Sequence, residues 1–470
     1  MKFNYLPFMI AAALGSIAAG AHASGYRFGS QSVTAQGTAD ANGAEAGDAS
    51  TVFYNPAGLA RLNGKQIALG ATVVVPHSTY TDTGSTRFTG TSSGGGAARD
   101  YAPGSVTAPS LYYSDRIDDQ WAFGIGLFVP YGAKLDYGDT WSGRYALSNI
   151  ELEAIALNPS ISFKLGERHA FGFGVSAEFM KASLAQAVDV PGSVRALSGN
   201  AAGQALVRQI AAAGGNPAVL ADARDAHGAN DGQDWGFGFN LGYLYQLNQD
   251  TRLGLAYRSS VAHSLKGDTV WDFSGATTDP VVNAILAAAS HRVNSAALVK
   301  LRTPETVSAN VFHQIDARWA AMADLTWSRH SRLNHLNIAF PGTDEGDEVI
   351  RQQWKNTYRL AIGGNYRYSE HLVLRAGLAY DQSPVRGPEL THPALPDSDR
   401  SQLSFGASYR FNAHSSIDLA YSYLDFKDAQ MNYQNHCNPL AVGCTGNGET
   451  TRGVYQTRLQ LLGLAYNYTF

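Results

Sequence analysis

The sequence of 470 residues contains little cysteine, and beyond residue 23 it contains no long run of apolar residues. The missing runs exclude a bundle of membrane-spanning helices, and the mean hydropathy of −0.18 agrees with this. The only two cysteines, Cys437 and Cys444, lie close together in a segment rich in Asn, Gly and Thr. In an exported protein such a pair is typical of a disulfide that closes a loop, whereas a metal site would need more ligands than the neighbouring His436.

An excess of positive charge is also missing, since the formal net charge is −4. Bulk charge therefore does not suggest nucleic acid as a partner. The histidines are scattered without the spacing of a zinc site, so we expect no metal and no cofactor. Gly90 to Gly94 fits the pattern G-x-S-x-G, but it lies in a Ser/Gly-rich segment without the strand–turn–helix context of a nucleophile. We therefore predict no catalytic residue, and an enzyme built on this chain is the weaker alternative.

The first residues have the features of a signal peptide. Lys2 supplies a positive charge, residues 6–20 are apolar, and Ala21-His22-Ala23 has the small-x-small form of a cleavage site. A transmembrane anchor is the competing interpretation, but the apolar run is short for a span. We therefore expect residues 1–23 to be removed and the mature, exported chain to begin at Ser24.

Alternation of large and small side chains is the dominant pattern of the remaining chain. In the final segment, "LLGLAYNYTF", every second residue from Leu462 to Phe470 is large and apolar. The segments "WGFGFNLGYLYQL" and "HAFGFGVSAEF" alternate in the same way. A soluble sandwich also alternates, but aromatic residues at strand ends with aliphatic residues between them are typical of a wall that faces lipid. A terminal Phe on an aromatic-rich strand resembles the C-terminal signal of bacterial outer-membrane barrels.

Runs of this kind predict about fourteen strands, an even number as closed bacterial barrels have. Short connections alternate with long ones, which is typical of short periplasmic turns and long outer loops. We therefore predict an all-β fold, a transmembrane antiparallel barrel over residues 64–470. The strands are predicted to begin near Lys65, Thr107, Gln120, Ile150, His169, Gln233, Thr251, Ala297, Arg318, Ile350, His371, Arg400, Ser415 and Arg452.

The face opposite the large side chains is rich in Gly, Ala and Ser. A general polar porin, another alternative, would line its lumen with charge, whereas small inward residues leave room for a solid filling. Residues 24–63 precede the first strand and contain Asn55-Pro56-Ala57, a sequence that favours turns. We therefore predict that residues 24–63 form a plug, or hatch, inside the barrel.

The order of these features resembles the FadL family of outer-membrane transporters. The segment "SGYRFGSQSVTAQGTADANGAEAGDASTVFYNPAGLARL" is similar to the family's hatch, with Asn55, Pro56 and Ala57 as its motif. The segments "TRLGLAYRSSV", "NTYRLAIGGNYRYSEHLVLRAGLAYDQSPV" and "PDSDRSQLSFGASYRF" are similar to its later strands. The resemblance implies uptake of long-chain fatty acids or, in some branches, of neutral aromatic hydrocarbons. It also implies capture between outer loops, transfer to an inner pocket, and lateral exit after movement of the hatch and a kink in the third strand.

The resemblance also implies residues that bind ligand. Gly25, Tyr26 and Phe28 match family positions that touch ligand, and Arg351 and Lys355 lie near a basic family position. Gln186 stands where a family arginine would bind a carboxylate. The choice between a fatty acid and a neutral hydrocarbon therefore stays open.

Two further segments fit the implied path. In "DPVVNAILAAASHRV", Asp279 is a predicted N-cap, and Val282, Ile285 and Leu286 fall on one helix face. That face either packs against another loop helix or lines a groove that captures ligand. Pro130 in "WAFGIGLFVPYG" cannot donate to a sheet, so it marks either a kink in the third strand or the strand end.

These observations together place the protein in the bacterial outer membrane as a monomer. The expected partners are long-chain fatty acids or other hydrophobic small molecules, together with the lipid and lipopolysaccharide of that membrane. Adhesion and phage reception are further roles that the same outer loops could serve without any change of fold.

Overall fold

The computed structural model describes residues 26–102, 104–441 and 443–470. The predicted signal peptide, residues 1–23, and the predicted ligand residue Gly25 lie outside this part of the chain. Among the described residues, none of the helices has the length and the hydropathy needed to cross a bilayer.

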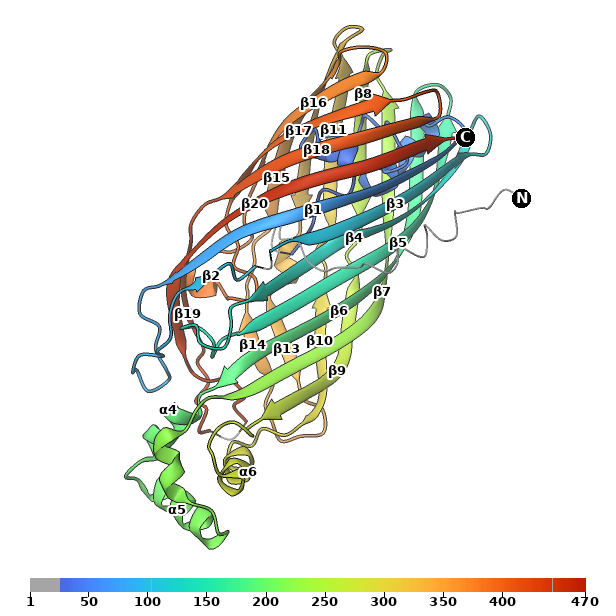
Figure 1. The fold of residues 1–470 in the computed structure, drawn as a ribbon. Coiled ribbons are helices and arrows are strands. Elements are labelled where there is room, and N and C mark those ends of the chain that lie inside the picture. Colours follow the sequence, from blue (N-terminus) through green and yellow to red (C-terminus); the bar gives the residue numbers. More distant parts are fainter. Residues whose placement is uncertain (1–25, 103, 442) are drawn as a thin grey trace, which may run out of the picture.

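A closed antiparallel barrel of 14 strands dominates the molecule, and it closes where the first strand pairs with the last (Figure 1). Closure matters because backbone groups at an open sheet edge would have no partner in lipid. The barrel confirms the predicted fold class. In chain order the strands are β1 Lys65–Asp82, β3 Val106–Arg116, β4 Trp121–Asp136, β5 Asn149–Leu165, β6 His169–Val188, β7 Ala226–Gln246, β8 Thr251–Arg258, β11 Thr306–Gln314, β12 Trp319–Ser328, β15 Thr357–Arg367, β16 Leu372–Asp381, β17 Arg400–Arg410, β18 Ser415–Phe426 and β20 Thr450–Thr469.

The long connections gather at the end of the barrel opposite the C-terminus (Figure 1). Short turns join the strands at the other end, so the long-loop end faces outward. The outer end holds the strands β2 Ala98–Arg99, β9 Ala262–Asp272, β10 Ser295–Arg302, β13 His335–Ala339, β14 Glu348–Arg351 and β19 Ala429–Gln434 and the helices α4 Val190–Leu197, α5 Ala201–Ala212, η2 Pro217–Asp222, α6 Pro280–Ala289, η3 His330–Arg332 and η4 Pro388–Leu390.

The wall shows the alternation that the sequence predicts. Phe171, Phe173 and Val175 of β6 are 45%, 47% and 48% exposed on the outside of the barrel. The glycines between them, Gly172 and Gly174, face the lumen, where they lie against other parts of the chain. The apolar outside therefore suits contact with lipid.

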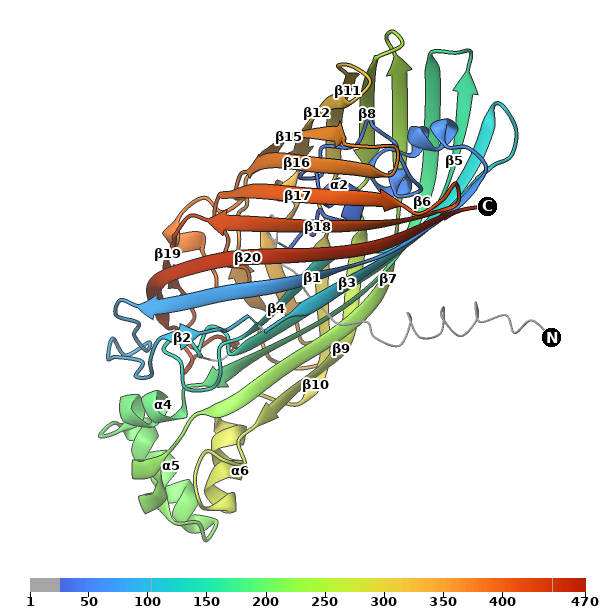
Figure 2. The ribbon, with the colours of Figure 1, turned by 45° about the horizontal axis from the view of Figure 1, so that its top comes forward.

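Residues 26–63 lie inside the barrel as the short helices α2 Val33–Gln36, α3 Thr51–Tyr54 and η1 Pro56–Arg61 (Figure 2). They approach the strands so closely that inward side chains are excluded. A Cβ on Gly172 would lie 2.2 Å from the Ala57 amide nitrogen, and one on Gly377 would lie 2.2 Å from the Thr38 carbonyl carbon. The small inward residues of the strands therefore make room for this segment.

Asn55 connects the inner segment to the wall. Its side-chain oxygen accepts a hydrogen bond from the Ala57 amide at 3.1 Å, which caps η1, and Pro56 occupies the first position of that helix. Its side-chain nitrogen donates to the carbonyl oxygens of Tyr243, at 3.2 Å, and Leu255, at 3.4 Å. The Asn-Pro-Ala sequence thus combines a helix start with a bond to two strands.

The close packing predicts different effects for two neighbouring glycines of β15. A Cβ on Gly363 would lie 2.7 Å from the Thr38 Cβ atom, whereas one on Gly364 meets only the Ala320 carbonyl oxygen at 3.3 Å. We expect Gly363→Val to lower the free energy of unfolding by about 1–3 kcal/mol, as overpacking does, and Gly364→Val to lower it less. Urea unfolding in detergent measures both variants, and equal losses would contradict direct contact between this strand and the inner segment.

Candidate functional site

The outer half of the barrel interior is filled by a large apolar cluster with many aromatic side chains. Tyr26, at its inner boundary, has its ring centroid 5.2 Å from that of Tyr131 and 6.0 Å from that of Trp354. Rings at such distances pack favourably and form a surface that suits an apolar ligand. Tyr26 is 3% exposed, so its side chain is buried.

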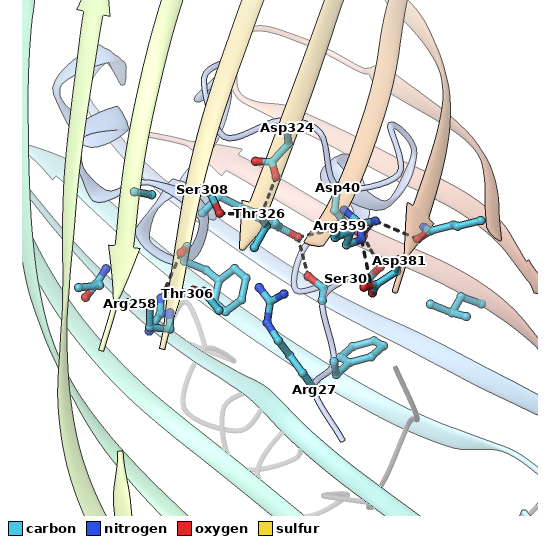
Figure 3. Close-up of a pocket in the computed structure, with 18 of the residues that line it drawn as sticks. Arg27, Ser30, Asp40, Arg258, Thr306, Ser308, Asp324, Thr326, Arg359 and Asp381 are labelled. Carbon is cyan, nitrogen blue, oxygen red and sulfur yellow. Dashed lines mark hydrogen bonds and ion pairs between the residues drawn. The ribbon is translucent and has the colours of Figure 1, made fainter. Parts of the chain in front are cut away.

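A polar pocket lies between the apolar cluster and the inner helices (Figure 3). The N-terminal segment, the inner helices and strands from opposite sides of the barrel all contribute to it. Its charged and hydroxyl-bearing lining residues include Arg27, Ser30, Asp40, Tyr54, Arg258, Thr306, Ser308, Asp324, Thr326, Arg359, Asp381 and Arg400.

Two of the four pocket arginines are ion-paired. Arg359 Nη2 lies 3.6 Å from Asp40 Oδ2, and Arg400 Nη2 lies 2.5 Å from Asp381 Oδ2. These pairs fix charges that would be costly to bury alone.

Arg27 and Arg258 differ from these pairs, because neither forms an ion pair within 4.0 Å among the described residues. Figure 3 shows the Arg27 side chain extending from the N-terminal segment into the pocket, with Arg258, the last residue of β8, to its left. Since an enclosed positive charge favours an anionic partner, these two guanidinium groups make the pocket a candidate site for an anion.

Arg258 is held in place by neutral groups. It donates to the side-chain oxygen of Asn158 at 3.2 Å and to the carbonyl oxygen of Phe53 at 3.1 Å. Its guanidinium carbon lies 4.8 Å from the ring centroid of Phe53 and 5.4 Å from that of Phe128. The guanidinium is therefore oriented without being neutralised.

The third barrel strand, β4, is irregular next to the pocket. Its register with β5 shifts between Phe128 and Tyr131, the residues on either side of Val129 and Pro130. Its pairing with β3 ends at Leu127. Within the described chain, the outer part of β4 thus lacks β3 as a neighbour, and its backbone needs other partners.

The N-terminal segment supplies these partners. The Phe28 amide donates to the Pro130 carbonyl oxygen at 2.8 Å, and the Gly132 amide donates to the Tyr26 carbonyl oxygen at 2.9 Å. Arg27 and Tyr131 are opposite each other in this antiparallel bridge. Residues 26–28 therefore act as a short strand that covers the irregular part of β4.

The predicted ligand residues lie in different places. Tyr26 and Phe28 are each 3% exposed, Tyr26 in the outer apolar cluster and Phe28 at the polar pocket. Arg351 lies in β14 and donates from Nη2 to the Gln434 carbonyl oxygen at 3.1 Å. Lys355 is exposed. Arg351 and Lys355 thus belong to the outer loops and not to the polar pocket, and their predicted role stays a prediction.

The predicted apolar face of α6 is packed in the outer loops. Asp279 caps this helix, and Val282, Ile285 and Leu286 are 0%, 9% and 8% exposed. They share one apolar cluster with Ile210 of α5. A capture groove at this face would require the two loop helices to separate.

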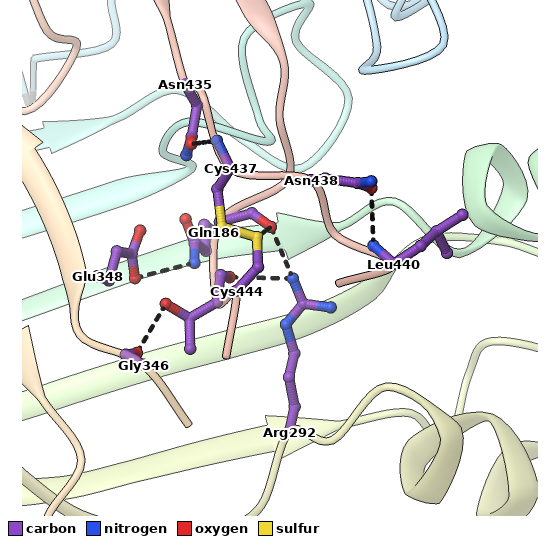
Figure 4. Close-up of a disulfide and its surroundings, with 11 residues drawn as sticks. Gln186, Arg292, Gly346, Glu348, Asn435, Cys437, Asn438, Leu440 and Cys444 are labelled. Atoms are coloured by element: carbon purple, nitrogen blue, oxygen red, sulfur yellow. Dashed lines mark hydrogen bonds between the residues drawn. A yellow bond between two sulfur atoms is a disulfide. The ribbon is translucent and has the colours of Figure 1, made fainter. Parts of the chain in front are cut away.

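The disulfide Cys437–Cys444 closes a loop that connects the other outer loops (Figure 4). Arg292 donates to the carbonyl oxygens of Thr445, at 3.0 Å, and Gly446, at 3.2 Å. Asn447 donates to the carbonyl oxygens of Tyr145 and Ala187, each at 2.9 Å. Gln186 is buried nearby, where it donates to Glu348 at 3.3 Å. Gln186, which stands where the family has an arginine, thus lies among the connected outer loops.

Sequence reasoning missed the arginines of the pocket. Arg258, Arg359 and Arg400 all occur in segments that the sequence assigns to strands. Each lies an even number of residues from the small residues of its strand, so it is on the same, lumen-facing side. This alternation is the signal that could have identified the three arginines. Their convergence depends on the pairing of distant strands, which local alternation does not specify.

A closed barrel with an apolar exterior and short turns at one end is typical of a bacterial outer-membrane protein. Over residues 14–470 the chain matches the family described as outer membrane protein transport protein (OMPP1/FadL/TodX), and it belongs to this family. It is therefore an outer-membrane transporter of hydrophobic compounds, and the family is one of transporters and not of enzymes.

Relatives of this chain match it over nearly their whole length. An outer membrane protein of Neisseria meningitidis serogroup B is 34% identical, with 96% of each chain covered. The long-chain fatty acid transport protein of Escherichia coli K12 is 28% identical, covering 90% of this chain and 92% of its own. The crystal structure of a Pseudomonas aeruginosa FadL homologue has a TM-score of 0.80 at 24% identity, covering 95% of this chain and 100% of its own, which supports the fold.

The outer loop network predicts a pH dependence. Burial raises the pKa of Glu449 to about 7, and the carboxylates of Glu348 and Asp189 add to the shift. An unfolded Glu has a pKa of about 4.3, so the stabilisation from the neutral carboxyl is complete below that pH and is lost as the pH rises through about 7. We expect Glu449→Gln, which stays neutral, to protect the loops from proteolysis increasingly as the pH rises from about 4 to 7, and equally at higher pH.

The ratio of cleavage rates, wild type over Glu449→Gln, measures this effect, because the protease responds to pH equally in both samples. The ratio should be near one at about pH 4, should increase several-fold by about pH 7, and should then level off. A ratio that is constant over this range would contradict the prediction.

Proposed function

We propose that the protein takes up long-chain fatty acids, or amphipathic molecules with a similar tail and an anionic head, across the outer membrane. The observation that carries this proposal is the pair Arg27 and Arg258, two guanidinium groups that have no carboxylate partner among the described residues and lie beside an aromatic cluster. A carboxylate would neutralise them, while an apolar tail would gain roughly 0.8 kcal/mol per buried CH₂ group.

We further propose that residues 24–63 serve as a hatch and that ligand leaves sideways next to Pro130. The covering of β4 by residues 26–28 supports this route, because two backbone bonds join the N-terminal segment to β4 where β3 is not paired with it. Arg27 belongs to the same segment. A ligand that binds Arg27 could therefore draw this segment away from β4 and open the wall.

Capture at the outer loops would precede these steps. The apolar cluster of α5 and α6 supports a first contact there, in which Val282, Ile285 and Leu286 become available when the helices separate. The solved structures that resemble this chain include the Pseudomonas putida toluene transporter TodX, with a TM-score of 0.64 at 21% identity, covering 90% of this chain and 94% of its own. Uptake of neutral aromatic hydrocarbons is therefore the second candidate, and the aromatic rings of the outer apolar cluster favour it.

Binding of oleate and of oleyl alcohol distinguishes these candidates, because the two ligands share a tail and differ in the head group. We expect Arg258→Met to weaken oleate binding by about ten- to a hundredfold, since a hydrogen bond to a charged group contributes about 1.5–3 kcal/mol. Binding of oleyl alcohol should change by less than about threefold. Fluorescence displacement on the purified barrel measures both affinities.

Arg351→Met is the matched control for this experiment, since it removes an arginine from the outer loops. It should leave the binding of both ligands unchanged. If Arg351→Met weakens the binding of oleate and Arg258→Met does not, the carboxylate head group is bound in the outer loops. If Arg258→Met weakens both ligands equally, Arg258 is structural and the neutral hydrocarbon becomes the better substrate class.

The lateral route predicts that a covalent bond between residues 27 and 131 blocks transport. These two residues face each other at a non-hydrogen-bonded position, where Cα atoms are about 4.5 Å apart and a disulfide fits. In the double variant Arg27→Cys and Tyr131→Cys, we expect the reduced protein to take up less oleate than wild type, because Arg27 is removed, and we expect oxidation to abolish the uptake that remains. Wild type in the same reductant controls for reduction of Cys437–Cys444, and equal uptake by the oxidised and reduced variant would rule out this route.

A further inference from the structure

The outside of the barrel carries an aromatic pair midway along β6 and β7, both of which continue outward beyond it. A tilted strand crosses the hydrocarbon in about 9–11 residues, so the pair lies where the membrane-spanning part of β6 ends. The ring centroids of Phe179 and Trp235 lie 5.2 Å apart, and Trp235 is 59% exposed. Exposed aromatic residues at the ends of lipid-facing strands mark the boundary between hydrocarbon and head groups. The residues that follow outward on the same faces therefore meet the head groups of the outer leaflet.

Three exposed lysines occupy that position on neighbouring strands. Lys181 of β6 is opposite Gln233 of β7, and Gln233 is opposite Lys266 of β9. Lys266 is opposite Leu298 of β10, two residues before Lys300. Neighbouring strands are about 4.8 Å apart, so Lys181 and Lys266 lie about 10 Å from each other, and Lys266 and Lys300 are diagonal neighbours at about 7–8 Å.

These lysines have no carboxylate within 4.0 Å among the described residues, unlike several other outward cations of the barrel. Cations elsewhere on the outer end form ion pairs: Lys134 with Glu151 at 3.4 Å, Lys427 with Asp399 at 3.0 Å and Arg458 with Asp425 at 3.3 Å. Exposed cations without an ion pair among the described residues also occur elsewhere, as at Arg452 of β20, so the sector from β6 to β10 is distinguished by having unpaired cations on neighbouring strands.

The acidic residues of this sector lie mostly further from the aromatic pair. Asp231 follows two positions beyond Gln233 on β7, and Asp268 follows two positions beyond Lys266 on β9. Glu153 is opposite Lys181 in register, without forming an ion pair with it. Asp231 and Asp268 thus lie further out than the lysines, whereas Glu153 lies level with Lys181.

We propose that Lys181, Lys266 and Lys300 bind the phosphate groups of lipopolysaccharide in the outer leaflet. A cluster of cations next to the hydrocarbon boundary attracts phosphorylated head groups, and Lys binds phosphate as a compact charge. Lipopolysaccharide carries more than one phosphate on a single molecule, so it can span lysines that are about 10 Å apart. Phosphatidylglycerol carries one phosphate and would reach only one of them, so the spacing favours lipopolysaccharide.

Native mass spectrometry of the purified barrel in neutral detergent with a chelator tests this proposal. The probes are deep-rough lipopolysaccharide, the same material after removal of its phosphates, and phosphatidylglycerol. The test variant carries Lys181→Gln, Lys266→Gln and Lys300→Gln, and the matched control carries Lys134→Gln, Lys427→Gln and Arg458→Gln. Heat-dependent mobility on gels reports that each variant is folded.

We expect the test variant to bind lipopolysaccharide about 100-fold more weakly than wild type, since each surface cation contributes a few-fold. The control variant should lose less than about threefold, because its cations are exposed and already paired. Dephosphorylated material should bind all three proteins equally. Equal losses in both variants, or loss with dephosphorylated material, would overturn the proposal, and so would phosphatidylglycerol binding that equals lipopolysaccharide in strength and in dependence on the three lysines.

Discussion

Every backbone amide and carbonyl in a membrane needs a hydrogen-bond partner from the protein, and this requirement governs the structure at β4. In an ideal barrel of 14 strands, pairing of every strand with both neighbours would satisfy all of these backbone groups. Here β4 is no longer paired with β3 beyond Leu127, and its register with β5 shifts at Pro130. The amide of Phe28 and the carbonyl of Tyr26 complete its bonding from inside the lumen. The wall and the inner segment are therefore not independent, and a change in one frees polar groups in the other.

Close contact between the inner segment and the strands explains which residues line the lumen. Inner helices that touch strand backbones leave no room for side chains, so the strands present glycine where the segment passes, as at Gly172 and Gly377. Where the segment turns away from the wall, a pocket remains, and there the strands present arginine, aspartate and hydroxyl groups. Arg359 and Arg400 form ion pairs with aspartates, whereas Arg27 and Arg258 have no ion pair within 4.0 Å among the described residues. One side of the pocket is therefore neutralised by the protein, and the other side can bind an anion.

Alternation let the sequence predict the barrel well, because a lipid-facing wall imposes a period of two on every strand. Lys65, His169, Thr251, Arg400 and Ser415 begin strands as predicted. β7 begins at Ala226 and not near Gln233, because its hairpin with β6 continues beyond the membrane, where polar residues suit a strand equally well. The pocket could not be predicted, since Arg258 and Arg27 meet through the closure of the whole sheet and not through local spacing.

The account depends most directly on the bonds between residues 26–28 and β4. Hydrogen exchange of the Gly132 and Phe28 amides in bilayers, with and without oleate, measures those bonds individually. The account predicts that both amides are protected without ligand and that oleate accelerates their exchange together, while amides of the regular strand β18 stay protected. Fast exchange at both positions without ligand, or protection that oleate leaves unchanged, would contradict a segment that covers β4 and releases it when ligand binds.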